Sequence, residues 1–399
     1  MMEYRNLSKK FIAAVLCANM TFMYTPVGAL ASEISGYGQT SGTFNIDAAK
    51  VSGDTGFRYY DKFNLTQGDI ANLIYKDNYS KFVNLVNNQV NINGIVNTMK
   101  NNAFYNGHAI FVSPSGIVIG ASGVLNVGSL SLLTPSQSKF DSFKSAYESG
   151  SLSVYEFNAD SYKGLITDSH GNVVINGKIL ARGDVNVYGD DVTIQGTTTD
   201  KAGIIAGWND TNTLISSENQ AKTIFNNLVS NNITDTTNFA FQNGKIKIVA
   251  SEKSAMNDAA GDVSANINIK NANLGSNEID IKSNAEVDRQ ERVALAKAKI
   301  DIEDSNLTGD TVSIVANASQ NKSLNISSVE DDLALVANTL VDIFDPDAPG
   351  INDLWGVAGK AQAEVNIKNS VVQAVKKFTT GDNIDTSIVI NAIASSETE

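Results

Sequence analysis

The chain has 399 residues, and its 43 Asp and Glu outnumber its 30 Lys and Arg, which gives a net charge of −13. An acidic surface repels phosphate groups, so the composition argues against a nucleic-acid partner. The 30 Gly, together with many Asn, Asp, Ser and Thr, favour a chain with frequent turns. A single cysteine, Cys17, excludes a disulfide-stapled scaffold.

Residues 1–31 have the organisation of a secretory signal peptide. Three basic residues near the N-terminus precede a mostly apolar run at Phe11–Tyr24, which is shorter than the roughly 20 residues of a membrane-spanning helix. The small side chains of Ala29 and Ala31 predict cleavage before Ser32. Cleavage would remove the only cysteine, which suits a protein that crosses a second membrane unfolded.

The next segment alternates apolar with polar residues, which predicts β-strands. Gly42–Ile46 and Phe57–Leu65 follow this pattern. Val90–Ile95 predicts a further strand, interrupted by the turn pair Asn93–Gly94. We expect this region to lead into the main body of the fold.

The stretch Gly107–Pro135 organises the rest of the chain. It predicts short β-branched strands separated by sharp corners, where Pro and Gly supply the backbone angles that a corner needs. The expected strands are His108–Val112, Ile117–Ile119 and Val124–Leu133, and the expected corners are Ser113–Gly116 and Gly120–Gly123. This alternation indicates a chain that winds into a solenoid instead of folding back as hairpins.

The first of these corners carries a family resemblance. Its residues are Ser113, Pro114, Ser115, Gly116 and Ile117, followed by a short apolar strand and a glycine. They resemble the Asn-Pro-Asn-Gly-Ile signature of the two-partner-secretion filamentous haemagglutinins and adhesins, with Ser in place of both Asn. Ser makes the same side-chain bond to the backbone more weakly. The likeness is strongest to the leukotoxin-type filamentous adhesins and extends over about residues 57–200.

The resemblance implies an all-β fold: a right-handed parallel β-helix (β-solenoid) with an N-terminal cap and short helical extrusions. It also implies a noncatalytic adhesin or leukotoxin-type protein without cofactors, secreted or held at the cell surface. A separate outer-membrane two-partner-secretion transporter would export it, so it would meet a membrane only during export. In the family, the motif acts in folding and secretion, and the mature protein binds a host-cell or bacterial surface receptor.

Helical spacing of apolar residues appears at Lys139–Phe157 and Asp332–Phe344, so each predicts a helix outside the strands. The Asn-rich segment Ala221–Ile233 is a candidate for a second short excursion. The first helix would either cover a patch of sheet or contact a receptor. We favour the first role, in which the helix covers a patch of sheet, because apolar stripes on helices usually pack against the protein.

Short strands resume over residues 164–199. The inward-facing side chains of successive strands are expected to stack rung on rung. These side chains are Val173 and Ile175, then Val185 and Val187, then Val192 and Ile194.

One corner in this region contains an Arg-Gly-Asp tripeptide, Arg182–Asp184. Such a tripeptide can mark an integrin ligand. Gly-Asp before a strand is also ordinary turn chemistry, which is the interpretation we favour for so short a motif.

A repeat begins near residue 245. Corresponding apolar positions lie 33 residues apart in three places, which are Ile267 and Ile300, Leu274 and Leu307, and Ile279 and Val312. Val365–Val372 is a partial third copy. A fixed period of this size predicts a stacked array. We therefore divide the chain into a signal peptide (1–31), a secretion domain (32–244) and a repetitive β-solenoid (245–399) that does not visibly end at Glu399.

Candidates for chemistry are few. His108 and His170 lie in different segments and predict no metal cluster. Four acidic residues lie close together near residue 345, and we favour a solvated loop there over a calcium site; they are Asp342, Asp345, Asp347 and Asp353. The alternative to an adhesin is an extracellular polysaccharide lyase or hydrolase on the same scaffold. Such an enzyme would need paired carboxylates, or calcium-binding Asp with a nearby cation, in a groove.

Overall fold

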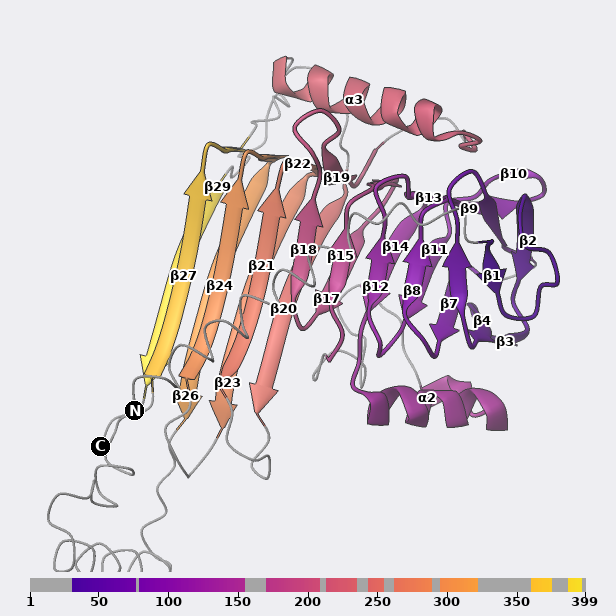
Figure 1. The fold of residues 1–399 in the computed structure, drawn as a ribbon, viewed down its shortest axis with the longest axis horizontal. Helices are drawn as coiled ribbons and strands as arrows, with labels where there is room; N and C mark the ends of the chain where they lie inside the picture. Colours follow the sequence, from indigo (N-terminus) through magenta and orange to yellow (C-terminus); the bar gives the residue numbers. More distant parts are fainter. Residues whose placement is uncertain are drawn as a thin grey trace, which may run out of the picture. The chain divides into compact units, whose positions relative to one another are not determined.

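Short apolar segments, separated by corners rich in Gly and Asn, form the strands of this protein. The computed structural model describes residues 31–76, 79–154, 170–208, 213–234, 243–254, 262–288, 295–321, 360–374 and 387–396. Within these ranges the chain is mostly β, and nearly all strands pair in parallel (Figure 1). Residues 1–30, the expected helix at Asp332–Phe344 and the acidic loop lie outside the described residues.

Three sheets collect the strands, and consecutive strands of the chain fall in different sheets. Sheet A contains β1 (Glu33–Ile34), β5 (Phe63–Leu65), β8 (Val90–Ile92), β12 (Ile117–Ile119), β15 (Val173–Ile175), β18 (Val192–Gln195), β21 (Val263–Lys270), β24 (Leu295–Glu303) and β27 (Lys360–Lys368). Sheet B contains β2 (Thr43–Asp47), β6 (Ile70–Ile74), β9 (Ile95–Lys100), β13 (Val124–Val127), β16 (Lys178–Ala181), β19 (Ala202–Ile205), β22 (Ala272–Gly275), β25 (Asn306–Gly309) and β28 (Val371–Ala374), with β10 (Ala103–Phe104) beside β9. Sheet C contains β3 (Lys50–Ser52), β4 (Thr55–Tyr60), β7 (Lys81–Val86), β11 (His108–Val112), β14 (Ser129–Leu133), β17 (Val185–Gly189), β20 (Lys245–Ser254), β23 (Glu278–Asp288), β26 (Thr311–Asn321) and β29 (Ser387–Ser396).

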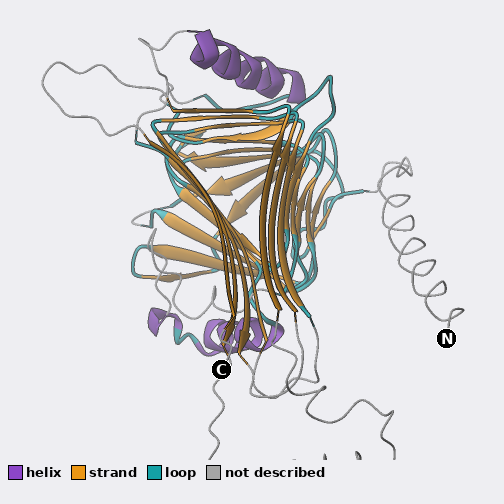
Figure 2. Ribbon diagram, turned by 90° about the vertical axis from the view of Figure 1, so that its left-hand side faces the viewer, coloured by secondary structure: helices purple, strands orange, loops and turns teal. Residues whose placement is uncertain are grey.

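The chain therefore visits sheets C, A and B in turn and then returns to sheet C, which is a solenoid-like architecture. We call three consecutive strands, one from each sheet, a rung. Figure 2 shows the strands of the three sheets around a common interior. The sheets run past residue 244 without interruption, because β17 pairs with β20 and β18 with β21.

Alternate side chains of each strand point into this interior, where they form one continuous apolar core. In sheet A, Val173 pairs with Val192 and Ile175 with Ile194, as expected from the sequence. Val185, in contrast, lies in sheet C and pairs with Leu130. One expectation was wrong in detail: the third central strand is two strands, β13 in sheet B and β14 in sheet C.

The break between β13 and β14 occurs at Gly128, where a rung turns a corner. A Cβ atom on Gly128 would lie 2.4 Å from the carbonyl carbon of Asn106 and 2.5 Å from the Gly107 oxygen. Only glycine permits so close an approach of two backbones. A lone glycine in an apolar run is compatible with either a strand or a corner, and the neighbouring backbone decides between them.

The N-terminal end of the coil carries antiparallel strands. β1 pairs antiparallel with β5, and β3 with β4. Strand β2 lies at the edge of sheet B, and side chains cover part of its backbone. Gln39 donates to the Thr43 carbonyl at 2.8 Å, and Arg58 donates to the Asp47 carbonyl at 2.6 Å. These bonds occupy edge groups that would otherwise be available for pairing with another strand.

Two helices cover outer faces of the sheets. Helix α2 (Gln137–Ser149) packs Phe140 and Phe143 against sheet C, and α3 (Glu218–Thr234) packs Phe225 against sheet B. Figure 1 shows the two helices on different sides of the strands. Helix α2 ends at Gly150, whose φ of 83° is left-handed, and a short 3-10 helix, η1 (Leu152–Val154), follows. The helix predicted at Lys139–Phe157 is confirmed as α2, which covers a sheet as favoured. The excursion expected at Ala221–Ile233 is helix α3.

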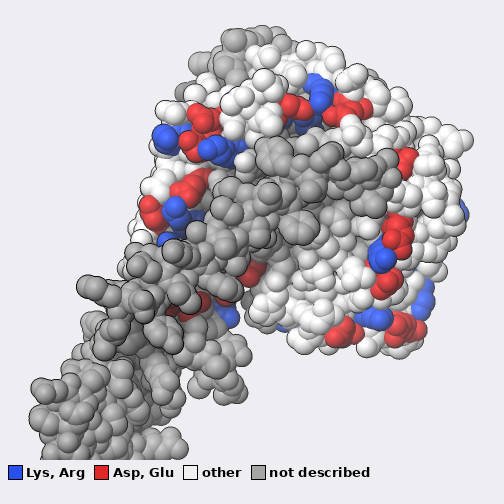
Figure 3. Space-filling model, in the orientation of Figure 1, with Lys and Arg blue, Asp and Glu red and all other residues white. Residues whose placement is uncertain are grey.

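The repeat predicted from the sequence is confirmed by strand register. Ile267 pairs with Ile300, and Leu274 with Leu307, so each residue lies beside its counterpart in the next copy. Ion pairs on the outside keep the same offset of 33 residues, such as Lys245–Glu278 at 2.7 Å. Basic and acidic side chains accordingly lie next to one another on the face shown in Figure 3.

Candidate functional site

The motif that carries the family resemblance forms the corner between β11 and β12. The Gly116 amide donates to the Ser113 carbonyl at 3.4 Å and closes the turn. Gly116 has a φ of 98°, which L side chains rarely adopt, and Pro114 supplies the restricted φ of the first corner position. A Cβ on Gly116 would lie 2.8 Å from the carbonyl oxygen of Asn172 in the next rung.

Hydrogen bonds join this corner to the rungs on both sides. The Ser113 hydroxyl donates to the Asn88 carbonyl at 2.9 Å, and the Ser115 hydroxyl donates to the Asn87 carbonyl at 3.2 Å. On the other side, the Ile117 amide donates to the Asn172 carbonyl at 3.0 Å. The five motif residues therefore lie together and set the register of three rungs. None of them titrates near neutral pH, so their contribution is structural.

The predicted cleavage site lies next to the first strand. Ala31 is exposed, whereas Ser32 is buried, and Ala29 lies outside the described residues. The Ser32 hydroxyl donates to the Asp69 carboxylate at 2.6 Å. Burial by itself raises the pKa of Asp69, but bonds from Ser32, from the Gly42 amide and from a threonine hydroxyl hold it below its ordinary value. Ser32 is thus held within the folded body.

The Arg-Gly-Asp tripeptide is not displayed as a free loop. The Arg182 guanidinium lies between two aromatic rings, 3.9 Å from the centroid of Phe104 and 4.2 Å from that of Trp208. It also donates to the side-chain oxygen of Asn126. Asp184 accepts a bond from the Lys245 amide at 3.0 Å. These contacts support the structural interpretation of the tripeptide.

Arg182 ends a ladder of asparagine side chains on the outer face of sheet B. Each Asn after the first donates through Nδ2 to the Oδ1 of the Asn in the preceding rung. The three steps are Asn126 to Asn97 at 2.7 Å, Asn97 to Asn72 at 3.3 Å, and Asn72 to Asn45 at 3.1 Å. The amides of the ladder therefore all point the same way, and such chains polarise one another cooperatively.

The middle of the ladder is covered by a segment that precedes α3. Asn97 makes two bonds with Ile215: its Nδ2 donates to the Ile215 carbonyl at 3.0 Å, and its Oδ1 accepts from the Ile215 amide at 3.1 Å. Asn126 donates to the Thr213 carbonyl at 3.0 Å. The ladder therefore binds backbone amide groups through both atoms of a side-chain amide.

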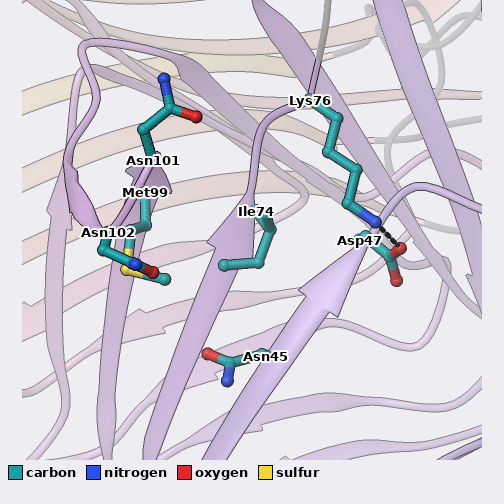
Figure 4. Close-up of a pocket in the computed structure, with 7 residues that line it drawn as sticks. All are labelled: Asn45, Asp47, Ile74, Lys76, Met99, Asn101 and Asn102. Atoms are coloured by element: carbon teal, nitrogen blue, oxygen red, sulfur yellow. Dashed lines mark hydrogen bonds and ion pairs between the residues drawn. The ribbon is translucent and has the colours of Figure 1, made fainter.

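The other end of the ladder opens into a groove of about 340 Å³ at the ends of β2, β6 and β9. Its apolar floor is Ile74 and Met99, and its polar walls are Asn45, Asp47, Lys76, Asn101 and Asn102. Figure 4 shows Met99 and Asn102 on one side of Ile74 and the Lys76–Asp47 ion pair, 2.5 Å long, on the other. The groove is accordingly amphipathic and close to neutral.

Asp47 is held as an anion at the edge of this groove. The hydrogen bond from Lys76 is the largest cause of its lowered pKa, and the charge of Arg58 contributes, while partial burial opposes them. Arg58 also stacks over the Tyr37 ring, 5.2 Å from its centroid. Both cations are therefore engaged in holding one carboxylate.

The two histidines do not come together. His108 starts β11, and its Nε2 lies 2.7 Å from the Ser131 hydroxyl. Burial first, and the charge of Lys81 second, lower the pKa of His108 to about 4, so this imidazole is neutral at pH 7. Ser131 is fully buried, whereas His108 is partly exposed. His170 instead donates its backbone amide to the Thr134 carbonyl, beyond the far end of β14.

Comparisons with family models, with curated proteins and with solved structures find no match for this chain. Among the described residues, no group of three or more potential ligands could hold a metal ion, and no helix is long and apolar enough to cross a bilayer. The function of this chain is therefore inferred from its own sequence and geometry.

Sequence reasoning missed the ladder and the groove. A signal was present, because Asn45, Asn72, Asn97 and Asn126 each lie within a strand directly after an apolar residue. A single outward Asn in one strand does not predict a ladder. The ladder can be recognised only when it is known which strands are neighbours and bring the side-chain amides into contact.

Proposed function

We propose that this chain is a secreted, noncatalytic adhesin of the leukotoxin-type filamentous class, built as a right-handed parallel β-helix. Residues 32–244 would be the secretion domain that a separate outer-membrane two-partner-secretion transporter recognises, after removal of residues 1–31. The late strands would extend the solenoid outside the cell and present a surface to a host-cell or bacterial receptor.

The observation that carries this proposal is the corner at Ser113–Ile117. Its side chains bond to the rung before it and its backbone bonds to the rung after it. A chain that emerges from a pore with its N-terminus first must form each rung on the previous one. A corner that holds three rungs in register would supply the template for this growth.

The contrast between the two ends of the coil also supports growth from the N-terminal end toward the C-terminal end. Antiparallel strands and side-chain bonds blunt the N-terminal edge. The last strand of sheet C leaves apolar side chains exposed that continue the interior columns of Val312 and Ile314, namely Ile388 at 44 % and Ile390 at 45 %. Addition of strands at that end would bury them, and the free energy of burial would oppose sliding back into the pore.

The test is secretion from a host with an outer membrane, with and without the transporter partner. We expect folded protein in the medium only with the transporter, and a strong loss with Pro114→Ala combined with Gly116→Ala. Gly150→Ala is a matched control, because Gly150 also has a left-handed φ, but a Cβ on it would have no described atom within 4 Å. Equal release without a transporter, or equal loss in the control, would contradict the secretion-domain assignment.

The alternative of a polysaccharide lyase or hydrolase is tested on the same material. The groove described above has one carboxylate, Asp47, held between Lys76 and Arg58. Paired carboxylates on either side of a glycosidic bond are the usual requirement for hydrolysis. Release of reducing ends from acidic or neutral polysaccharides, abolished by Asp47→Asn, would favour the enzyme over the adhesin.

A further inference from the structure

The groove beside Asn45 has the features of a small-ligand site. Its volume of about 340 Å³ is enough for one or two sugar units. Ile74 and Met99 provide an apolar floor, and side-chain amides on two walls provide both donors and acceptors. Among the described residues that line it, the one cation and the one anion pair with each other, so a neutral ligand fits better than an ionic one.

The ladder itself shows which group such an amide binds. Asn97 donates from Nδ2 to the Ile215 carbonyl and accepts through Oδ1 from the Ile215 amide, so it binds polar groups of two successive peptide units. Asn45 occupies the equivalent position two rungs earlier in the same ladder, with its Oδ1 accepting from Asn72. Its own Nδ2 has no partner among the described residues, and the residue lines the groove. A carbonyl acceptor would complete the chain of bonds.

An extended peptide is a poor candidate for this position. A peptide that added to β2 as a strand would need the outward backbone groups of that strand. Gln39 occupies the Thr43 carbonyl at 2.8 Å, and Arg58 occupies the Asp47 carbonyl at 2.6 Å. A compact ligand that carries one amide avoids both obstacles.

We infer that this groove binds the acetamido group of an N-acetylated hexosamine. The Asn45 amide donates to the acetamido carbonyl, and the methyl group packs on Met99 and Ile74. Asn102, on the opposite wall, faces the sugar hydroxyls and can exchange hydrogen bonds with them. This assigns a ligand class, which the proposed function does not, and binding by the purified protein does not depend on export.

The experiment is ligand-observed NMR with the purified full chain and N-acetylglucosamine or its dimer, followed by a titration. Glucose is the comparison ligand, since it lacks the acetamido group. Asn45→Ala removes the head of the ladder. Asn102→Gly removes the opposite amide without straining the turn, because Asn102 has a left-handed φ of 59°.

Asn91→Ala is the matched control. Asn91 donates to Asn64 at 3.0 Å in a similar pair on sheet A, away from the groove. We expect saturable binding of the acetylated sugar, about tenfold weaker with Asn45→Ala or Asn102→Gly and unchanged with Asn91→Ala. Glucose should bind at least about tenfold more weakly than the acetylated sugar.

Four outcomes would overturn the inference. The first is no saturable signal for the acetylated sugar with the wild-type chain. The second is equal affinity for glucose, which would remove the role of the acetamido group. The third is equal affinity of Asn45→Ala and Asn91→Ala for the acetylated sugar. The fourth is preferred binding of a blocked dipeptide amide over the sugar. Loss of secretion would leave all of these measurements intact, so the two proposals fail separately.

Discussion

The early rungs, β2 to β19, and the late rungs, β20 to β29, are stabilised in different ways. The early interior is rich in fully buried aromatic side chains, and edge-to-face pairs such as Phe63–Phe111, with centroids 5.4 Å apart, link sheets A and C across the interior. The late interior in the described residues is Ile, Val, Leu and Ala, stacked on their own counterparts. Strands lengthen as well, from 3 residues in β12 to 11 in β23.

This difference shows how one coil can combine specificity with extension. In the early rungs, each aromatic side chain has one set of neighbours, so a shifted register would open cavities. In the late rungs, a shift by a whole copy puts similar residues in similar places, so the local sequence specifies register weakly. We conclude that the early rungs set the register and the late rungs copy it.

The largest expected effect comes from the aromatic core. Phe111→Ala should lower the free energy of unfolding by about 3–5 kcal/mol, because it removes a fully buried ring and leaves a cavity. Ile300→Ala in the late rungs should act locally, since a stacked array can open from one end. Urea unfolding would measure the loss of stability in each variant, and hydrogen exchange would show which strands open. Equal exchange of β7 and β11 in the two variants would contradict the comparison.

Substitution of a corner glycine should also cost more stability in the early rungs than in the late rungs, but less than Phe111→Ala. A Cβ on Gly123 would lie 2.3 Å from the Ile92 oxygen, whereas one on Gly309 would lie 3.0 Å from the Ser276 oxygen. We expect Gly123→Ala to cost about 3 kcal/mol and Gly309→Ala about 1 kcal/mol, because only the first forces the backbone apart. Thermal unfolding of both variants would test this. A larger loss at Gly309 would show that the late corners are the tighter ones.

The junction between early and late rungs should respond to pH. Burial first, and then the charges of Glu252 and Asp191, raise the pKa of Asp190 to about 7. An unfolded Asp has a pKa of about 3.9, so the folded state binds an extra proton between about pH 4 and pH 7. The stability due to this proton is fully present below about pH 4 and is lost as pH rises through about 7.

Asp190→Asn should therefore flatten the dependence of melting temperature on pH across this window, as measured by calorimetry. Asp141→Asn on the exposed side of α2 is the control and should keep the wild-type slope. Parallel slopes for Asp190→Asn and wild type would show that this carboxyl ionises without affecting folding.

The smallest effect is expected on the outside of the late rungs. Lys253 and Glu286 form an ion pair at 2.8 Å with both side chains partly exposed. Exposed pairs of this kind contribute about 0.2–1 kcal/mol and are screened by salt. Lys253→Gln should lower stability by no more than this, and by less at high salt. A loss comparable to Phe111→Ala would mean that outer charges, and not the interior, hold the late rungs together.

Local patterns were most informative where the chain repeats. The offset of 33 residues between Ile267 and Ile300 predicted their pairing, and the Pro-Gly corner after β11 was placed correctly. The early strands offered no such guide. Successive ladder asparagines are separated by 27, 25 and 29 residues, so no single period reveals that Asn45 and Asn126 belong to one ladder.

The amino-acid sequence by itself determined most strands and corners, the first of the helices that cover the sheets and the register of the late rungs. Strand and helix periods are local, and a repeat carries its own register, so both are readable along the chain. Tertiary structure alone decided the split at Gly128, the stacking of Arg182 between two rings, and the groove at Asn45. Each depends on which strands become neighbours, and in the early rungs that choice is made by the packing of unlike side chains across the whole interior.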